Sequence, residues 1–359
     1  MSVVGARPQL VKLAPIAEAV AATEHEHFLV HTGQHYDTDL SEVFFDGLGI
    51  PAPDVQLRVG SGSHGAQTGR MLAELEPVID RERPDWVLVY GDTNSTIAAA
   101  LAAVKLHVPV AHLEAGLRSG NRRMPEEHNR VLTDHASDLL LAPTEAAMRQ
   151  LGREGLADRS VLVGDVMVDV CLQVRDAVLA GRAQPPALPD GIEPGTPYLL
   201  ATLHRPGNTD DPERLGAILG ALAALPLPVA LLAHPRLVAK AAHHGIELSR
   251  GSLRVGRPLP YAQLIGAVLG SAGVITDSGG LQKESYLLGR PCTTIRPETE
   301  WMETLENDWN RLVPDPFAMS PQVWAATAIR SLPETGPGAH FGDGHAARRV
   351  VEALALRVS

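Results

Sequence analysis

The sequence has few cysteines, few aromatic residues and no excess of positive charge. Its two cysteines, Cys171 and Cys292, lie far apart and form no CxxC pattern, so neither a disulfide framework nor a cysteine-based zinc site is indicated. Aromatic residues make up only 4% of the chain, which offers no stacking platform for nucleic-acid bases. The net charge of -11 argues against nucleic acid or an anionic membrane surface as a partner.

Long apolar runs and targeting signals are also missing. The first residues, Met1 to Val4, run directly into a predicted strand, without a basic region, a cleavage site or an apolar segment of membrane-spanning length. We therefore expect a cytoplasmic protein that does not bind membranes. Histidines and acids show no metal-ligand spacing such as HExxH, so we expect no metal site.

The chain contains two series of alternating strands and helices. The first series predicts strands at 2–5, 27–31, 85–90, 108–113 and 138–141 and helices at 9–23, 65–81, 96–105 and 127–135. The second series predicts strands at 198–202, 228–233, 253–256 and 273–276 and helices at 212–224, 261–269 and 281–288. Between them, residues 180–197 are rich in proline and glycine and have no period. Hydrophobic residues make up 45% of the 359, enough to give each series a core.

Short apolar strands that alternate with longer helices indicate parallel sheets covered on both faces. We therefore expect an α/β fold of two doubly wound, Rossmann-like domains that face a cleft. The expected N-terminal domain covers residues 1–168, a connection covers 169–189, and the C-terminal domain covers 190–336. A last helix, at about 340–359, could return to the N-terminal domain.

The stretch from residue 273 to 284 predicts an anion site. A buried strand ends at Thr276, a tight turn follows, and a helix begins near Leu281. The first N–H groups of a helix lack intrahelical partners and favour an anion, and Gly279 and Gly280 carry no Cβ to keep a phosphate away. Glu284 lies one turn further on, where its carboxylate could accept hydrogen bonds from a ribose diol. The alternative is that the glycines serve only the geometry of the turn.

Three carboxylates follow apolar strands in the first series. Asp92 and Glu114 each come directly after a strand, and Glu126 lies in the next loop. Because the carboxyl ends of parallel strands meet at one edge of a sheet, we expect these acids to lie together and to raise one another's pKa, as proton transfer requires. The alternative is that Asp92 caps the helix that starts near Asn94. For Glu127 we favour a structural role in the first turn of a helix.

Cations are also predicted at the carboxyl edges. His204 and Arg205 follow the first strand of the second series, and Arg7 follows the first strand of the chain. Cations from both domains could neutralise a departing pyrophosphate.

Six motifs, in order along the chain, resemble the non-hydrolysing UDP-N-acetylglucosamine 2-epimerases. They are residues 4–9 (Val-Gly-Ala-Arg-Pro-Gln), 31–37 (His-Thr-Gly-Gln-His-Tyr-Asp), 90–96 (Tyr-Gly-Asp-Thr-Asn-Ser-Thr), 112–118 (His-Leu-Glu-Ala-Gly-Leu-Arg), 123–127 (Arg-Met-Pro-Glu-Glu) and 276–280 (Thr-Asp-Ser-Gly-Gly). The resemblance implies the two-domain fold of the GT-B glycosyltransferases, a homodimer and the interconversion of UDP-GlcNAc and UDP-ManNAc. It implies that UDP is eliminated to leave a 2-acetamidoglucal and is then added back, with no redox cofactor.

The resemblance also implies the roles of individual residues. Four residues are implied to be catalytic: Asp92, Glu114, Glu126 and His204. Six are implied to bind the UDP-sugar: Arg7, Lys12, Ser278, Gly279, Gly280 and Glu284. Which carboxylate serves which face of C2 stays open.

Three positions depart from the common pattern of the family. Gln9 replaces a frequent glutamate, Gly207 an acid near His204, and Trp301 an arginine that contacts UDP in many relatives. The pattern around Gln34, at Gln282–Glu284 and at Thr299–Trp301 resembles the branch with UDP-2,3-diacetamido-glucuronate 2-epimerases, so that sugar is a second candidate substrate. Three further functions stay open, namely those of a GT-B glycosyltransferase, a hydrolysing epimerase and a catalytically silent nucleotide-sugar sensor.

Overall fold

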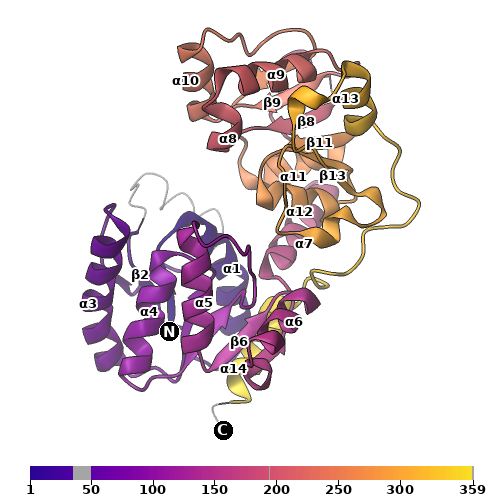
Figure 1. Ribbon diagram of the computed structural model, residues 1–359. Helices are drawn as coiled ribbons and strands as arrows, with labels where there is room; N and C mark the ends of the chain where they lie inside the picture. Colours follow the sequence, from indigo (N-terminus) through magenta and orange to yellow (C-terminus); the bar gives the residue numbers. More distant parts are fainter. Residues whose placement is uncertain (35–49, 194, 358–359) are drawn as a thin grey trace. The chain divides into compact units, whose positions relative to one another are not determined.

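The computed structural model describes residues 1–34, 50–193 and 195–357. The chain forms two compact units (Figure 1). The first contains Met1–Val170 and Ala339–Ser359, and the second contains Cys171–Gly338. Both cysteines are free and buried. None of the helices in the described ranges has the length and apolar content to cross a membrane.

The first unit is built on a parallel sheet. In its described part the seven strands are β1 (Ser2–Val4), β2 (Leu29–His31), β3 (Val55–Gln56), β4 (Val87–Tyr90), β5 (Val110–Leu113), β6 (Leu139–Ala142) and β7 (Ser160–Leu162). They are arranged in the order β3-β2-β1-β4-β5-β6-β7. The helices are α1 (Arg7–Ala21), α3 (His64–Glu82), α4 (Asn94–Lys105), α5 (Pro125–Ala136), α6 (Glu145–Arg153), the start of α7 (Val166–Leu179) and α14 (Ala346–Ala355), with a 3-10 turn, η1 (Ala157–Arg159).

Helices cover both faces of this sheet because the strands are apolar on both sides. On one face, Leu13 of α1 and Val350 of α14 pack with Leu113 in one buried cluster. On the other face, Leu75 of α3 and Ala99 of α4 pack against the opposite side of the strands.

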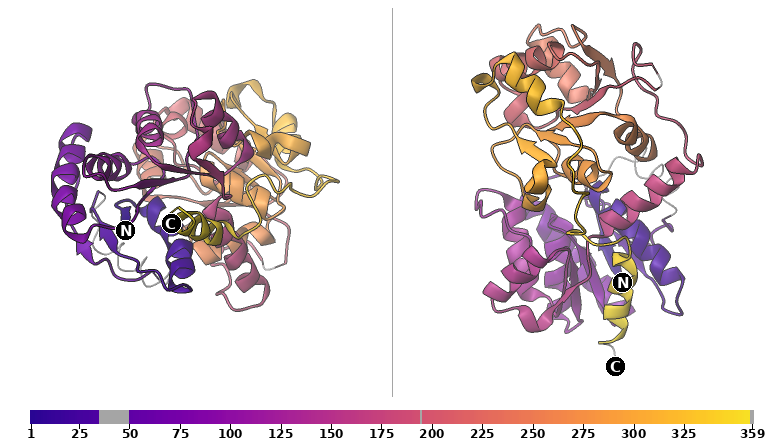
Figure 2. Two further views of the ribbon diagram at one scale, coloured as in Figure 1. Left: turned by 90° about the horizontal axis from the view of Figure 1, so that it is seen from below. Right: turned by 90° about the vertical axis from the view of Figure 1, so that its right-hand side faces the viewer.

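The C-terminal helix α14 belongs to the first unit. Asp169 holds its start, because its carboxylate accepts hydrogen bonds from the N–H groups of Ala346 (3.0 Å) and Ala347 (2.8 Å). An acid at this position satisfies N–H groups that have no partner inside the helix. Two further views show α14, in yellow, beside α1 (Figure 2).

The second unit repeats the plan with six parallel strands in its described part. They are β8 (Leu199–Thr202), β9 (Val229–Leu232), β10 (Leu253–Gly256), β11 (Gly273–Thr276), β12 (Cys292–Thr294) and β13 (Asn310–Leu312), in the order β10-β9-β8-β11-β12-β13. The helices are α8 (Pro206–Thr209), α9 (Pro212–Ala223), α10 (Pro235–His243), α11 (Tyr261–Gly270), α12 (Gly279–Leu287) and α13 (Pro321–Ala328), with 3-10 turns η2 (Met302–Asp308) and η3 (Pro316–Ala318).

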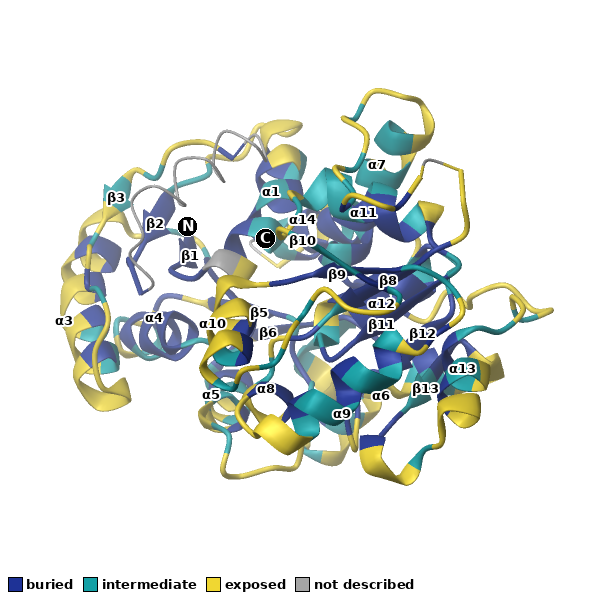
Figure 3. Ribbon diagram, turned by 90° about the horizontal axis from the view of Figure 1, so that it is seen from above, coloured by how far each residue is buried: buried dark blue, intermediate teal, exposed yellow. Residues whose placement is uncertain are grey.

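The central strands of this sheet, β8, β9 and β11, are buried between two helical layers (Figure 3). Leu219 of α9 and Trp324 of α13 pack on one face with Ile275. Val268 of α11 and Leu281 of α12 pack on the other face.

Chain order reverses at one place in each sheet. In the first sheet this place lies between β1 and β4, and in the second it lies between β8 and β11. At such a switch point the loops after the two strands leave toward opposite faces of the sheet, so a crevice opens beyond their carboxyl ends. These are the positions where a ligand is expected.

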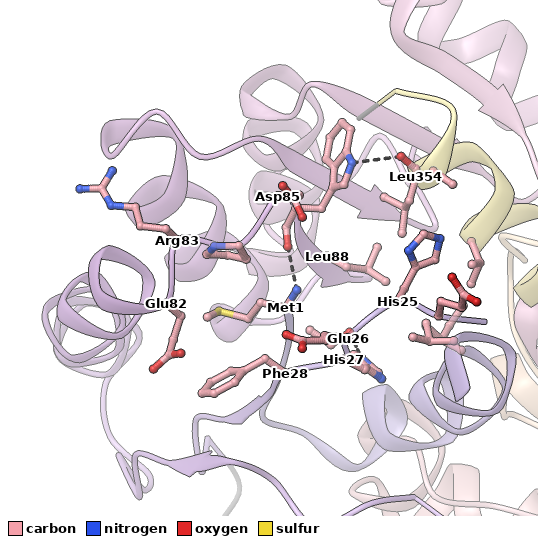
Figure 4. Close-up of a pocket in the computed structure, with 18 residues that line it drawn as sticks. Met1, His25, Glu26, His27, Phe28, Glu82, Arg83, Asp85, Leu88 and Leu354 are labelled. Carbon is pink, nitrogen blue, oxygen red and sulfur yellow. Dashed lines mark hydrogen bonds between the residues drawn. The ribbon is translucent and has the colours of Figure 1, made fainter. Parts of the chain in front are cut away.

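The first unit also has a cavity of about 790 Å³ at the opposite edge of its sheet (Figure 4). It lies where β1, β2 and β4 begin, and its walls include Phe28, Trp86 and Leu354. The Trp86 indole N–H donates to the Leu354 carbonyl at 3.2 Å. Because ligands of open α/β sheets bind at the carboxyl edge, size alone does not make this cavity the functional site.

The α/β fold class predicted from the sequence, with two doubly wound sheets, is confirmed. The long apolar strands and their helices were located to within a few residues. Strands β3, β7, β12 and β13 are not predicted from the sequence, because each has only two or three residues and no longer apolar run or alternation marks it. Helices α6, α10 and α13 are not predicted either. Helix α7 extends to Leu179, so the first half of the expected connection at 169–189 is helical.

Candidate active site

Asp92 and Glu114 lie at the switch-point edge of the first sheet. Strands β4 and β5 are paired with Tyr90 opposite Leu113, so the residues that follow them emerge at the same level. A Cβ built on Gly91 would meet Glu114 Oε2 at 3.2 Å and Lys12 Nζ at 3.3 Å. The turn that carries Asp92 therefore lies against the Glu114 carboxylate and the Lys12 ammonium.

The backbone at Glu114 is held in an unfavourable conformation. Its φ is +73°, in the left-handed region that residues with a Cβ avoid. The N–H groups of Glu114 and Ala115 both donate to the carbonyl of Leu141, at 3.1 and 3.2 Å, and so hold the turn. Strain of this kind persists where the surroundings fix a side chain, as in functional sites.

Two of the acids are paired with cations, which differs from the expectation of like charges that face one another. Glu114 forms an ion pair with Lys12, and Asp92 Oδ2 lies 2.7 Å from Arg130 Nη2. Burial alone would lower the pKa of Lys12, but Glu114, Asp92 and Asp165 outweigh it and raise that pKa. Lys12 therefore stays charged and compensates the acids.

Asp92 and Glu126 line one cavity of about 310 Å³. Its other described lining residues are Ala6, Pro8, Gln34, Ser61, Gly62, His64, Gln67, Thr93, Asn94, Pro125 and Asn129. None of these lining residues is a lysine or arginine, and most of the polar ones are neutral amides or hydroxyls. The side chain of Arg7, which begins α1, is outside the described part, as are His35, Tyr36 and Asp37.

The two structural interpretations, of Asp92 as a cap and of Glu127 as a first-turn acid, have different outcomes. Thr93, not Asp92, caps α4, because its hydroxyl accepts the N–H of Thr96. Glu127 is buried and accepts hydrogen bonds from Ser119, Gly120 and Arg130. Burial opposes ionisation of Glu127, but these hydrogen bonds lower its pKa. Glu127 thus shapes the loop before α5.

In the second unit, helix α12 begins directly after β11. Ser278 is its N-cap and accepts the N–H of Leu281 at 3.4 Å. A Cβ on Gly280 would have Ser278 Oγ, at 3.9 Å, as its nearest neighbour, so the first turn of the helix is open. At Gly279 a Cβ would collide with the Glu300 carboxylate. The open turn and the dipole of α12 suit an anion such as a phosphate.

Asp277 is the hub of this second cluster. It is fully buried and accepts hydrogen bonds from the backbone N–H groups of His204 (3.1 Å) and Arg205 (3.0 Å) and from the Asn208 side chain (3.1 Å). Its Oδ1 also lies 3.0 Å from Nδ1 of His204, whose side chain is 49% exposed. Burial alone would raise the pKa of Asp277, but His204, Arg205 and Asn208 lower it. Asp277 thus orients His204 with its other nitrogen outward.

Two arginines lie beside the start of α12. Arg205 Nε donates to the Asp277 carbonyl at 2.9 Å, and Arg296 forms a 2.8 Å ion pair with Glu300. Burial and the charge of Arg296 lower the pKa of Arg205, so the two guanidinium groups repel each other. An anion bound at α12 would relieve this repulsion.

Glu284 lies one turn into α12 and is 7% exposed. Burial, Glu284 and Cys171 together raise the pKa of Tyr261, which places these side chains close together. The neighbouring Lys283 ammonium lies 4.1 Å from the centre of the Trp301 ring, a cation–π contact. Trp301 therefore orders a cation of α12.

Comparisons with known proteins show which family the chain belongs to. The model of the family described as UDP-N-acetylglucosamine 2-epimerase matches residues 18–355. The chain belongs to this family. It is 45% identical, over 99% of both chains, to the UDP-2,3-diacetamido-2,3-dideoxy-D-glucuronate 2-epimerase of Pseudomonas aeruginosa. It is 37% identical to the UDP-N-acetylglucosamine 2-epimerase of Methanocaldococcus jannaschii, over 98% of this chain and 97% of that one.

Solved structures of the family have the same fold. The M. jannaschii UDP-GlcNAc 2-epimerase in complex with UDP-GlcNAc and UDP matches over 99% of both chains, with a TM-score of 0.82 and 35% identity. The UDP-GlcNAc 2-epimerase from Neisseria meningitidis bound to UDP-GlcNAc also has a TM-score of 0.82, with 26% identity over 99% of both chains. The family resemblance predicted from the motifs is therefore confirmed.

For this epimerase-family chain, the structure groups the predicted residues in two sets. Asp92, Glu114, Glu126 and Lys12 gather at the switch point of the first sheet. The second set follows β8 and β11 and contains His204, Ser278, Gly279, Gly280 and Glu284. Sequence reasoning missed Arg296, because it follows the unrecognised strand β12, and it missed Arg130 as the partner of Asp92. Asp277 lay inside a predicted motif but received no role.

We expect Asp277→Asn to lower the free energy of unfolding by about 2 kcal/mol at pH 7, because an amide cannot replace a carboxylate that accepts hydrogen bonds from several donors. Denaturant titration would measure this. The folded-state pKa of Asp277 lies below its ordinary value of 3.8, so its contribution is complete above that value and declines as the pH falls below it. The difference from wild type should therefore shrink in acid.

The matched control is Asp190→Asn, which changes an exposed aspartate of the same unit and should alter stability by no more than about 0.5 kcal/mol. An Asp277→Asn protein as stable as wild type at pH 7 would contradict the role of Asp277 as a hub.

Proposed function

We propose that the protein is a non-hydrolysing 2-epimerase that interconverts UDP-GlcNAc and UDP-ManNAc. The observation that carries the proposal is the pair of clusters in one epimerase-family chain: carboxylates at the switch point of the first sheet, and an anion cradle with two arginines at the switch point of the second. The reaction needs both kinds of group, because a proton leaves C2 while UDP leaves C1.

The proposed reaction has two halves that mirror each other. A carboxylate takes the proton from C2, the C1–O bond breaks with its electron pair going to UDP, and a C1–C2 double bond remains in 2-acetamidoglucal. A proton is then delivered to the opposite face of C2, and a phosphate oxygen of UDP bonds to C1 again. Atoms and charge balance without an oxidant or reductant.

We assign the proton transfers at C2 to Asp92, Glu114 and Glu126. Inversion requires proton handling on both faces of C2, which one carboxylate cannot perform from a single position. The separate environments support different roles, since Asp92 is held by Arg130 and Glu114 by Lys12. Glu126 lines the cavity with Asp92. Lys12 and Arg7 are assigned to the substrate by resemblance, and Lys12 also pairs with Glu114.

We assign the leaving diphosphate to the start of α12. Ser278 offers a hydroxyl, Gly279 and Gly280 offer backbone N–H groups, and Arg205 and Arg296 add positive charge beside the Glu300 carboxylate. His204, held by Asp277, assists at the same group. We place the ribose near Glu284, on the next turn of α12.

A second substrate is a specific alternative, because the Pseudomonas aeruginosa relative named for UDP-2,3-diacetamido-glucuronate is 45% identical to this chain. The cavity lined by Gln34, Gln67, Asn94 and Asn129 suits acetamido groups, which both donate and accept hydrogen bonds. The described lining residues include no lysine or arginine to pair with a uronate carboxylate.

We also propose a homodimer in the cytoplasm. The family resemblance supports the dimer, and two free cysteines support a reducing compartment. Sedimentation equilibrium at micromolar concentration should give twice the mass of one chain, and a monomer throughout would exclude the dimer.

The first test of the function is proton NMR of UDP-GlcNAc with the purified protein in deuterated water, without added cofactor. We expect UDP-ManNAc to form with deuterium at C2, because the proposed mechanism exchanges that proton with solvent. Formation of free ManNAc and UDP would instead indicate a hydrolysing enzyme. Exchange with UDP-2,3-diacetamido-glucuronate alone would establish the alternative substrate. No exchange with either sugar would refute the proposal.

The acid assignments predict that Asp92→Asn, Glu114→Gln and Glu126→Gln each lower kcat by roughly 100-fold or more, the usual contribution of a positioned acid or base. UDP binding, measured by calorimetry, should change little, because these residues are assigned to proton transfer. Glu145→Gln, at an exposed glutamate on α6 of the same unit, is the control and should retain full activity. Any acid variant with turnover within a few-fold of wild type would remove that residue from the assignment.

A further inference from the structure

His112 is a buried histidine for which the proposed mechanism has no role. It lies in β5, two residues before Glu114, and none of its surface is exposed. One ring nitrogen, Nε2, lies 2.7 Å from the carbonyl oxygen of Gly91, the residue that precedes Asp92. The other, Nδ1, lies 2.6 Å from the carboxylate of Asp134 on α5. A single side chain thus contacts the turns of two proposed catalytic acids.

Both ring nitrogens of His112 have a hydrogen-bond partner. The Gly91 carbonyl can only accept, so Nε2 donates to it, and Nδ1 lies against the Asp134 carboxylate, whose pKa is lowered by His112 and Arg118 against the effect of burial. The partners at both nitrogens therefore fix the orientation of the imidazole ring.

Asp134 extends the connection to the turn after Glu114. Its second oxygen accepts the N–H of Gly116 at 3.0 Å and lies 2.7 Å from Arg118. Gly116 has a φ of +84°, and a Cβ there would lie 2.6 Å from the carbonyl of Ala147, so this turn has little room to move. The pair of His112 and Asp134 consequently connects the turn before Asp92 with the turn after Glu114.

The backbone around Asp92 is held at three successive carbonyls. The Tyr90 carbonyl accepts from Gln9 at 2.8 Å, the Gly91 carbonyl accepts from His112, and the Asp92 carbonyl accepts from Asn129 at 2.9 Å. Gln9 lies on α1 and Asn129 on α5, whereas His112 belongs to the strand that carries Glu114. Of these three side chains, His112 is the one that ties Asp92 directly to Glu114.

We propose that His112, held by Asp134, is a positioning residue that fixes Asp92 and Glu114 relative to each other for proton transfer at C2. The inference rests on the proposed function, because it assumes that these two acids exchange protons with C2. His112 touches no substrate in this proposal. It acts through the Gly91 carbonyl, and a displacement of about 1 Å at a catalytic group can cost roughly 100-fold in rate.

The test uses two substitutions of His112 by an amide, each of which keeps one of its two hydrogen bonds and removes the other. In His112→Gln the amide nitrogen reaches the place of Nε2 and can still donate to Gly91, whereas in His112→Asn it reaches the place of Nδ1 and can still donate to Asp134. We expect His112→Asn to lose roughly 100-fold in kcat and His112→Gln to retain at least ten times the activity of His112→Asn. KM and UDP affinity should stay within about twofold of wild type in both.

If His112 had a purely structural role, the two variants would behave differently from this expectation. Each variant then loses one buried hydrogen bond, so activity should follow the thermal stability of the folded protein and not the identity of the lost bond. His135→Gln is the control. His135 lies on the same helix as Asp134, is 48% exposed and pairs with Glu154 at the outer end of the network, so its loss should leave kcat within about twofold.

The measurement is the rate of C2 proton exchange and of epimerisation in the full-length protein, with melting temperatures recorded for every variant. Equal kcat values for the Gln and Asn variants, beside an active wild type, would overturn the positioning role and leave the proposed function intact. A parallel fall in kcat and stability for both would do the same. A wild-type protein that exchanges no C2 proton would overturn the proposed function and this inference with it.

Discussion

Both clusters of polar side chains depend on one constraint, the reversal of strand order between β1 and β4 and between β8 and β11. At each reversal the loops diverge, and backbone and side-chain groups beyond the strand ends stay open to a ligand. The two sheets use this opening differently. The first places Asp92 and Glu114 on two adjoining turns, and the second places the N-terminus of α12 beside His204. One architectural rule thus yields both the proposed proton-transfer cluster and the proposed anion cradle.

Charge compensation decides what these clusters can do. Lys12 pairs with Glu114, and Arg130 pairs with Asp92. These cations reduce the electrostatic repulsion between the two acids at the edge of the first sheet. In the second unit Arg205 and Arg296 repel each other, Glu300 pairs with Arg296, and Asp277 supplies the buried negative charge that orders the loop. The first turn of α12, with Arg205 and Arg296 beside it, suits a phosphate, and the Glu300 carboxylate that pairs with Arg296 lies against the same turn.

The sequence predicted those parts of the site that follow long apolar strands. Asp92, Glu114 and His204 could be placed because β4, β5 and β8 have four apolar or mostly apolar residues each, and the end of such a strand is easy to locate. Arg296 could not, since β12 is a three-residue Cys-Thr-Thr segment. The cations that pair with the acids could not be predicted from the sequence for another reason. Lys12 and Arg130 lie on helices, and nothing in the local sequence tells which strand end a helical side chain will reach.

Gln9, which departs from the family pattern, forms hydrogen bonds through both the oxygen and the nitrogen of its side-chain amide. Its Oε1 accepts the N–H groups of Gly5 (2.8 Å) and Ala6 (3.0 Å), while its Nε2 donates to the Tyr90 carbonyl (2.8 Å) and the Thr96 hydroxyl (3.1 Å). A carboxylate could make the first two bonds but would face the Tyr90 carbonyl with no hydrogen to donate. The amide therefore joins the turn after β1 to the turn that carries Asp92 without adding another negative charge to an edge that already holds three acids.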